Sequence, residues 1–271
     1  MLEESGVPDA DFDSLCLIGH IFNADRTALI LHGDNLADGA LCRRFFASIE
    51  ERKTGKPLQY IIGKWNFMGF DFLVGEGVLI PRDDTEAAAE KALELAKLFD
   101  KPKIIDLCSG SGAIAITLGK LIPEAEVTAL ELSDDALFYL KKNIELNAAG
   151  NVTAVKGDVL EDHKLFPDGS FDIIVSNPPY IVTKQIDELQ RELAFEPRMA
   201  LDGGEDGLFF YREITAKWKT KLRSGGYLVY ETGEDEHEAV RDDMIKHGFE
   251  NVGYVLDLQG YKRVTFGKFS I

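Results

Sequence analysis

A short proline-rich stretch, Asn177-Pro178-Pro179-Tyr180, directly follows an apolar run that is typical of a buried strand (FDIIVS). Proline lacks a backbone N–H and fixes φ, so the two prolines predict a rigid, extended turn that cannot join a strand ladder. The Asn177 side-chain oxygen and the Pro178 carbonyl can then converge as two acceptors on one NH2 group. Such a grip would orient the weak lone pair of an amide or amino nitrogen toward an incoming methyl group. Tyr180 offers a flat, amphipathic wall for the target.

A glycine turn, DLCSGSG, lies between a predicted strand and a predicted helix. Its glycines allow the backbone to approach a ligand closely, and the N-terminus of the helix offers unpaired N–H groups. The acid at the end of the strand would repel a pyrophosphate but attract an ammonium group. The turn is therefore a candidate ligand-binding loop, although similar turns bind dinucleotides or serve only tight packing. The candidate binding residues in it are Asp106, Cys108, Ser109, Gly110, Ser111 and Gly112.

Two further strands end in acidic residues. Glu131 ends the next apolar run, 19 residues after Gly112, where nucleoside-binding α/β folds use an acid to accept hydrogen bonds from ribose hydroxyls. We expect Glu131 at a surface cleft rather than in the core. Asp158 follows the third strand, where an adenine amino group would come, and Val159 could line the ring. An ordinary loop aspartate remains the alternative for Asp158.

Other reactive side chains lack supporting partners. Cys108 has no accompanying histidine pattern, so a small packed residue is favoured over a nucleophile. Arg82 is open to three interpretations: a simple surface charge, a salt bridge or a contact with the substrate. We expect no metal site, because no pair of histidines has ligand spacing. The histidines are His20, His32, His163, His237 and His247.

The order of the predicted elements explains how these residues could meet. From Lys103 onward, apolar strands alternate with glycine turns and helices, which indicates a parallel sheet covered on both faces. The helices are expected from near Ser133, over 208–222 and over 235–247. The last two β-rich runs, FENVGYVLDL and YKRVTFGKF, are joined too closely for a crossover and must pair antiparallel. The carboxyl edge of such a sheet is the usual ligand-binding edge.

The first third of the chain has a different pattern. Residues 9–53 are helical in pattern, with Gly55 as the expected stop. In the first helix the expected apolar face comprises Phe12, Leu15, Cys16, Gly19 and Phe22, and in the last it comprises Leu41, Phe45 and Ile49. The run 65–78 predicts a hairpin, and a helix with Thr85 as N-cap follows it. We therefore predict a helical domain over 1–63, a β-hairpin linker over 64–80 and an α/β domain over 81–271.

Composition narrows the class of protein. The 271 residues carry 30 Lys and Arg against 47 Asp and Glu, a formal net charge of −17. Such a surface repels phosphate backbones and argues against nucleic-acid binding. No apolar run approaches the roughly 20 residues of a membrane span, and the first residues show no signal peptide. Three scattered cysteines form no disulfide framework. We expect a soluble, cytoplasmic protein without a membrane partner.

The strand-ending acid, the glycine turn, the second acid and Asn-Pro-Pro-Tyr together resemble the S-adenosylmethionine-dependent amino-group methyltransferases. Four more stretches resemble the release-factor glutamine methyltransferases, the HemK/PrmC family: PLQYIIG, the F-x-G-x-x-F run at 67–72, GVLIPRDDTE and GGEDGLFFYR. The resemblance implies a Rossmann-like class I methyltransferase sheet, mostly parallel with an antiparallel C-terminal hairpin, and a small helical N-terminal domain that helps to hold the release factor. It implies methyl transfer from S-adenosylmethionine, with S-adenosylhomocysteine as product, to the glutamine amide of a Gly-Gly-Gln loop.

The resemblance also implies roles for individual residues. Ser109 to Gly112 would cradle the methionine part of the cofactor, Glu131 would bind the ribose, and Val159 would flank the adenine. Asn177 would bind the target amide in a pocket shaped by Pro178, Pro179 and Tyr180. The chain departs from the family at three positions that bear on cofactor affinity: Cys108 replaces a common glycine, Glu131 a usual aspartate, and Val159 a common aromatic residue.

Two other functions share some of these features. An adenine-N6 or guanine-N2 methyltransferase of DNA or RNA can carry Asn-Pro-Pro-Tyr, but it needs a flipped base and a basic track for phosphates. This chain has no Lys/Arg cluster. A non-catalytic docking module would have no need of the intact glycine turn and Asn177.

Overall fold

The computed structural model describes residues 1–257 and 259–270, and its main feature is a seven-stranded sheet of order β5-β4-β3-β6-β7-β9-β8. The first five strands of that order are parallel, while β9 pairs antiparallel with both β7 and β8. The predicted parallel sheet with an antiparallel C-terminal hairpin is confirmed. The strands are β3 (Lys103–Leu107), β4 (Glu126–Glu131), β5 (Val152–Lys156), β6 (Phe171–Ser176), β7 (Leu222–Glu231), β8 (Phe249–Leu256) and β9 (Lys262–Phe269).

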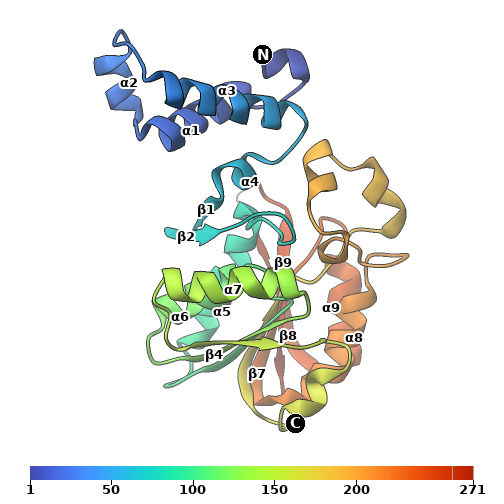
Figure 1. The fold of residues 1–271 in the computed structure, drawn as a ribbon. Helices are drawn as coiled ribbons and strands as arrows, with labels where there is room; N and C mark the ends of the chain where they lie inside the picture. The colour runs from blue at the N-terminus through green and yellow to red at the C-terminus, as the bar shows by residue number, and fades with distance from the viewer. Residues whose placement is uncertain (258, 271) are drawn as a thin grey trace.

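Helices cover both faces of this sheet (Figure 1). Each face of the sheet packs against its own group of helices. Successive strand residues point to opposite faces, so Ile104 packs against one group and Ile105 against the other. The first group is α5 (Glu86–Ala96), α6 (Ala113–Leu121) and α7 (Asp134–Leu146), and the second is α8 (Phe209–Trp218) and α9 (His237–Lys246). In the described ranges, no helix is long and apolar enough to cross a membrane.

The register of the parallel strands aligns their carboxyl ends. Leu107 of β3 pairs with Leu130 of β4 and with Ser176 of β6. Ser176 in turn pairs with Tyr230 of β7. The residues that come next on the four strands therefore share one level at the sheet edge. They are Cys108, Glu131, Asn177 and Glu231.

A two-stranded hairpin precedes the sheet, formed by β1 (Lys64–Phe67) and β2 (Phe70–Leu73). Met68 and Gly69 at its tip both have positive φ, 48° and 84°, the combination that a type I′ turn needs. The fully buried Asn143 of α7 exchanges two hydrogen bonds with Leu73 and donates another to the carbonyl of Ser111. One buried amide thus ties the hairpin to the glycine turn. The predicted hairpin exists, but its strands end at 73 rather than 78.

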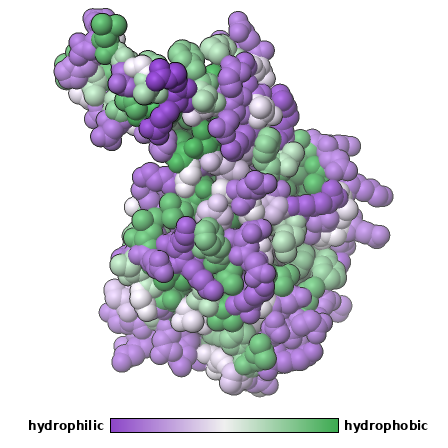
Figure 2. Space-filling model, viewed as in Figure 1, coloured by the Kyte–Doolittle hydropathy of each residue, from purple (hydrophilic) through white to green (hydrophobic). Residues whose placement is uncertain are grey.

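The N-terminal helices stand apart from the α/β body and join it through α4 and the hairpin (Figure 1). This face of the molecule is mostly hydrophilic, with hydrophobic residues gathered between the helices and the body (Figure 2). The helices are α1 (Ala10–Phe22), α2 (Arg26–His32), α3 (Gly39–Lys53) and α4 (Leu58–Ile62). Gly55, with φ of 97°, follows α3 as predicted. The short α4 was not predicted.

The predicted apolar face of α1 is wrong. The helix buries Ala10, Asp13, Leu17 and Ile21 instead, while Phe12 and Leu15 are 54% and 46% exposed. The physical reason is a buried ion pair that turns the polar Asp13 inward, and apolar periodicity cannot reveal such a pair. In α3 the predicted apolar stripe is fully buried only at Ile49, near the end of the helix. The other two residues of the stripe, Leu41 and Phe45, are half-buried.

The helix predicted after Thr85 begins where expected, with Thr85 at the N-cap position of α5, but in the described residues the Thr85 hydroxyl caps no backbone amide of the helix. The helix expected over 208–222 is α-helical only over α8, and a 3-10 turn, Lys219–Lys221, leads into β7 at Leu222. The cause is the sheet, which pairs Leu222 with Phe171.

Arg52 of α3 links the N-terminal helices to a long segment of the α/β body. Its Nε lies 2.6 Å from Asp13, its Nη2 lies 2.8 Å from Glu192, and the side chains of Arg52 and Asp13 are only 7% exposed. Glu192 belongs to a run of 3-10 turns (Thr183–Glu188, Arg191–Phe195 and Arg198–Ala200) that lies beside α4 (Figure 1). Because the pair is buried, each charge depends on the other for compensation.

We predict that Arg52→Met lowers the free energy of unfolding by about 3 kcal/mol, because it leaves the Asp13 carboxylate buried without its partner. Lys53→Met is the matched control, since Lys53 pairs at the surface with Glu50, and it should change stability by no more than about 0.5 kcal/mol. Urea denaturation measures both. Equal stabilities for the two variants would contradict the role given to Arg52.

Candidate active site

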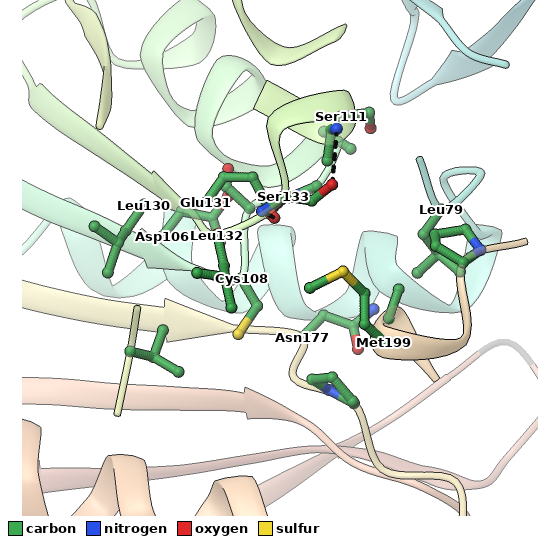
Figure 3. A pocket seen from close by; sticks show the side chains of 18 of the residues that line it. Leu79, Asp106, Cys108, Ser111, Leu130, Glu131, Leu132, Ser133, Asn177 and Met199 are labelled. Atoms are coloured by element: carbon green, nitrogen blue, oxygen red, sulfur yellow. Dashed lines mark hydrogen bonds between the residues drawn. The ribbon is translucent and has the colours of Figure 1, made fainter. Parts of the chain in front are cut away.

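A cavity of about 340 Å³ opens at the carboxyl ends of β3, β4 and β6. Asp106, Cys108 and Glu131 lie on one side of it, and Asn177, Met199 and Leu79 lie on the other (Figure 3). Of the residues predicted from the sequence, the cavity brings together Arg82, Asp106, Cys108, Ser109, Gly110, Ser111, Glu131, Asp158, Val159, Asn177 and Pro179. Residues from five separate segments thus share one space.

The glycine turn needs backbone conformations that side chains resist. Gly110 and Gly112 have φ of 57° and 86°, and a Cβ on Gly112 would lie 2.4 Å from Leu140. Cys108 adopts φ of 60° as well, which is the left-handed region that favours glycine. The conformation explains why a glycine suits this position. Gly112 caps α6, so the first amides of that helix face the cavity edge.

Asp106 is almost fully buried beneath the turn, at 1% exposure. Its Oδ2 accepts hydrogen bonds from Ser109 Oγ (2.6 Å) and from the amide of Ala115 (3.2 Å). Its Oδ1 finds no hydrogen-bond partner among the described residues. Burial raises the pKa of Asp106 to about 7, against these hydrogen bonds, which lower it. The carboxyl therefore keeps one acceptor for a ligand that donates.

Glu131 lines the cavity, but its expected place outside the core is wrong, because it is only 8% exposed. Its Oε2 accepts from the amide of Gly110 and its Oε1 from the amide of Ser133, both at 2.7 Å. Burial raises its pKa, while these amides lower it. Glu131 thus holds the glycine turn against the start of α7. Each oxygen retains a further lone pair for a ligand hydroxyl.

Asp158 and Val159 lie on the far wall of the cavity. Asp158 Oδ1 accepts from the amide of Leu160 at 2.8 Å, which is the turn geometry of an ordinary loop aspartate. Val159 is 6% exposed, and its carbonyl accepts from the indole of Trp218. The Val159 side chain is therefore held in place and offers an apolar contact for a flat ring.

Cys108 faces the cavity, and burial raises the pKa of its thiol well above the usual range. A thiol held neutral is a poor nucleophile, which agrees with its interpretation as a packed residue. The chain's cysteines, Cys16, Cys42 and Cys108, are free thiols. Over 1–257 and 259–270, no group of three or more His, Cys, Asp or Glu is placed to hold a metal ion.

A second cavity of about 460 Å³ adjoins the first, and Asn177 lines both. Pro179 lines the first cavity and Tyr180 the second. Pro178 is buried and, in the described part of the chain, lines neither. Gly203 fixes the turn from outside, because a Cβ there would lie 2.6 Å from the Tyr180 backbone. Asn177 therefore stands at the boundary between the two spaces.

Glu231 and Thr85 were not predicted as site residues. Glu231 ends β7 and lines the second cavity at 1% exposure, and Thr85 accepts a hydrogen bond from Asn177 Nδ2 at 3.2 Å. Burial raises the pKa of Glu231 to about 7. The sequence did contain a signal for Glu231. In the stretch YETG this acid ends a predicted strand, just as Asn177 follows the end of another, so both could be expected at the same edge of the sheet.

Arg82 borders both cavities and forms a salt bridge with the buried Glu196. Glu196 also accepts from the amide of Ile80 at 2.9 Å. The salt bridge considered for Arg82 is therefore formed, and its contact with a substrate stays a prediction. The salt bridge fastens the segment carrying Pro197 and Met199, which line the first cavity.

Family models match two parts of the chain. The model described as PrmC N-terminal domain matches residues 1–63, and the one described as Methyltransferase small domain matches residues 91–206.

Named relatives match over nearly the whole length. A release factor glutamine methyltransferase of Clostridium acetobutylicum is 40% identical over 256 residues, covering 93% of this chain and 89% of the relative. One of Geobacter sulfurreducens is 39% identical over 271 residues, covering 98% and 92%. Among solved structures, a methyltransferase from Pyrococcus furiosus superposes with a TM-score of 0.55 over 86% of this chain and 100% of its own. At 18% identity, that likeness concerns the fold alone.

The pKa of Asp106 predicts how stability depends on pH. Its ordinary value is 3.8 and its folded value about 7, so between these limits the folded state binds the additional proton. The free energy of unfolding contributed by Asp106 must therefore fall as pH rises through this window. Asp106→Asn should flatten that decline, while Glu126→Gln, a change at an exposed carboxyl, should not. Urea denaturation at several pH values checks this, and an unchanged slope for Asp106→Asn would contradict it.

Proposed function

The chain belongs to the release factor glutamine methyltransferase family, and on that basis we propose that it transfers a methyl group from S-adenosylmethionine to the side-chain amide nitrogen of the glutamine in the Gly-Gly-Gln loop of a peptide chain release factor. The observation that carries this proposal is the position of Asn177, which lines both cavities. A group that borders a cofactor space and a target space can hold the target amide at the point of transfer.

The first cavity fits S-adenosylmethionine. The unpartnered oxygen of Asp106 suits the ammonium group of the methionine part. Of the turn from Ser109 to Gly112, Ser109, Gly110 and Ser111 line the cavity, and Gly110 presents backbone to it without a Cβ atom. Glu131 has lone pairs for the ribose hydroxyls, and Val159 offers an apolar wall to the adenine.

When bound, the cofactor would supply an electrophilic methyl group and leave as S-adenosylhomocysteine, and the amide nitrogen that accepts the methyl group would release one proton to solvent. An amide nitrogen is a poor nucleophile because its lone pair is delocalised into the carbonyl. The protein's contribution is therefore orientation and acceptors for the positive charge that develops on nitrogen. We assign these acceptors to Asn177 Oδ1 and the carbonyl of Pro178, with Pro179 and Tyr180 shaping the two sides of the turn.

The remaining parts of the chain suit a protein target. We propose that residues 1–63 form a unit that helps to hold the release factor, with 64–80 as linker and 81–271 as the methyltransferase domain. We also propose that the protein acts in the cytoplasm and does not bind nucleic acid directly. The net charge of −17 supports the last point, since it repels phosphate backbones. A DNA or RNA methyltransferase, the alternative, gains no support from the named relatives.

The direct test supplies labelled S-adenosylmethionine and a release factor with either Gln or Ala in its Gly-Gly-Gln loop. We expect label on the Gln form alone. Asn177→Ala should lower turnover on that form by about 10²–10³, because one preorganised acceptor is lost. Cofactor affinity should stay within about threefold, since the other cavity residues remain.

Calorimetry and single-turnover assays separate these effects. Label on the Ala form would overturn the assignment of the target. Near-native turnover by Asn177→Ala would overturn the assignment of the acceptor.

Glu131 gives a separate prediction for the cofactor. Glu131→Ala should weaken S-adenosylmethionine binding by about 1.5–3 kcal/mol, because hydrogen bonds to a charged acceptor are lost. The variant should also lower the melting temperature of the ligand-free protein, since the amides of Gly110 and Ser133 lose their acceptor. Glu131→Gln, which keeps one carbonyl oxygen, should lose less of both. Calorimetric affinities equal to that of the unaltered protein would remove Glu131 from the site.

A further inference from the structure

The amide of Asn177 can present either its oxygen or its NH2 group to a target, and only one choice serves the reaction. The target nitrogen carries N–H bonds, so it needs an acceptor, and an NH2 group turned toward it would oppose two donors. The side chain can rotate by half a turn at little intrinsic cost, because the final torsion of asparagine has broad, roughly two-fold preferences. Something in the protein must therefore hold the amide in one orientation.

Thr85 is the residue in contact with the other end of this amide. Asn177 Nδ2 donates to Thr85 Oγ1 at 3.2 Å, which leaves Oδ1 for the space beyond. Thr85 is 5% exposed. It stands at the N-cap position of α5, where threonine usually caps the helix with its hydroxyl, yet this hydroxyl caps no helix amide in the described chain. The hydroxyl is thus available for Asn177.

Glu231 is the acidic group that acts on the Thr85 hydroxyl. Burial raises the pKa of Glu231, and the nearby hydroxyl of Thr85 lowers it, which means that the hydroxyl stabilises the charged carboxylate. The nearby charge of Arg263 also lowers this pKa, Asp84 raises it, and the hydroxyl of Tyr180 lowers it. Tyr180 lies 3.5 Å from Glu231 Oε1, whereas Oε2 is buried without a partner by hydrogen-bond criteria in the part of the chain described.

The polarity of the three groups follows from their chemistry. An ionised carboxylate can only accept, so the charge of Glu231 favours a Thr85 hydroxyl whose proton is turned toward it. The hydroxyl then meets Asn177 with a lone pair, and only the NH2 end of the amide can bond to it. The oxygen of Asn177 is left for the target. A rotated amide would bring Oδ1 against the Thr85 lone pairs and lose this bond.

We propose that Thr85 is a positioning residue, oriented by Glu231, that fixes the Asn177 amide with its oxygen toward the target glutamine. The inference rests on the proposed function and deepens it, because it names the residues that give the catalytic amide its direction. Thr85 and Glu231 come from two elements, the start of α5 and the end of β7, on opposite sides of the Asn177 turn in the sequence.

The test compares Thr85→Val, which keeps the side-chain shape and removes the hydroxyl, with Thr85→Ser, which retains the hydroxyl. Thr117→Val is the matched control, since Thr117 is fully buried in α6 and its hydroxyl has no partner in the described residues. Single-turnover methylation of the Gln-bearing release factor is measured at about pH 8, above the pKa of Glu231, with melting temperatures and cofactor affinities in parallel.

We expect Thr85→Val to lower turnover about 10-fold, with cofactor affinity changed by less than about threefold. Thr85→Ser should restore turnover to within about threefold, and Thr117→Val should leave it within about twofold of the unaltered protein. Native turnover by Thr85→Val would overturn the proposal.

A double-mutant cycle separates positioning from a general structural effect. If Thr85 acts through Asn177, adding Thr85→Val to Asn177→Ala should change the residual turnover by less than about twofold. A further 10-fold loss in that background would show a role independent of Asn177 and contradict the inference.

If Thr85→Val fails to fold, Glu231→Gln provides a second test of the proposal. A neutral amide at this position can donate to Thr85 and so removes the fixed direction of its hydroxyl. Turnover should fall about threefold or more in the native background and remain unchanged with Asn177→Ala. Unaltered turnover in Glu231→Gln would overturn the proposal. An unaltered protein that does not methylate the glutamine at all would instead contradict the proposed function, so the two failures are distinguishable.

Discussion

The alignment of strand ends is the constraint on which the site depends. Hydrogen bonding between parallel strands places Leu107, Leu130, Ser176 and Tyr230 in one row across the sheet. The residues that follow them must then emerge at one edge, whatever their separation in the chain. Cofactor-side groups from β3 and β4 are thereby brought beside the Asn177 turn after β6 and beside Glu231 after β7. The arrangement of the candidate site is a consequence of strand register more than of any single contact.

The meeting of the strand ends buries two acidic side chains. Asp106 and Glu231 are each 1% exposed, and each has an oxygen without a partner within the described ranges. Burial raises both pKa values to about 7. A core built only for stability would replace such groups with apolar side chains. The roles we propose for them would explain their presence: Asp106 would bind a ligand ammonium group, and Glu231 would act through Thr85 on the orientation of Asn177.

Local patterns in the sequence predicted much of this molecule, because strand–turn–helix repeats, the glycine turn and Asn-Pro-Pro-Tyr are each written in consecutive residues. Features that depend on distant partners were missed. The buried face of α1 follows from Asp13 meeting Arg52, 39 residues away. A salt bridge of Arg82 was considered, but its partner Glu196, 114 residues away, was not predicted. The contact of Thr85 with Asn177 was also missed, because a threonine before a helix predicts a hydroxyl that caps the helix.

The most direct measurement is a crystal structure of the protein with S-adenosylhomocysteine and a peptide that contains N5-methylglutamine. The account predicts the cofactor product in the cavity beneath the glycine turn and the methylated side chain beside Asn177. The methylated nitrogen should lie within hydrogen-bond distance of Asn177 Oδ1, while Nδ2 remains on Thr85. A methylglutamine bound away from Asn177, or an Asn177 amide rotated to present its NH2 group to the ligand, would contradict the account.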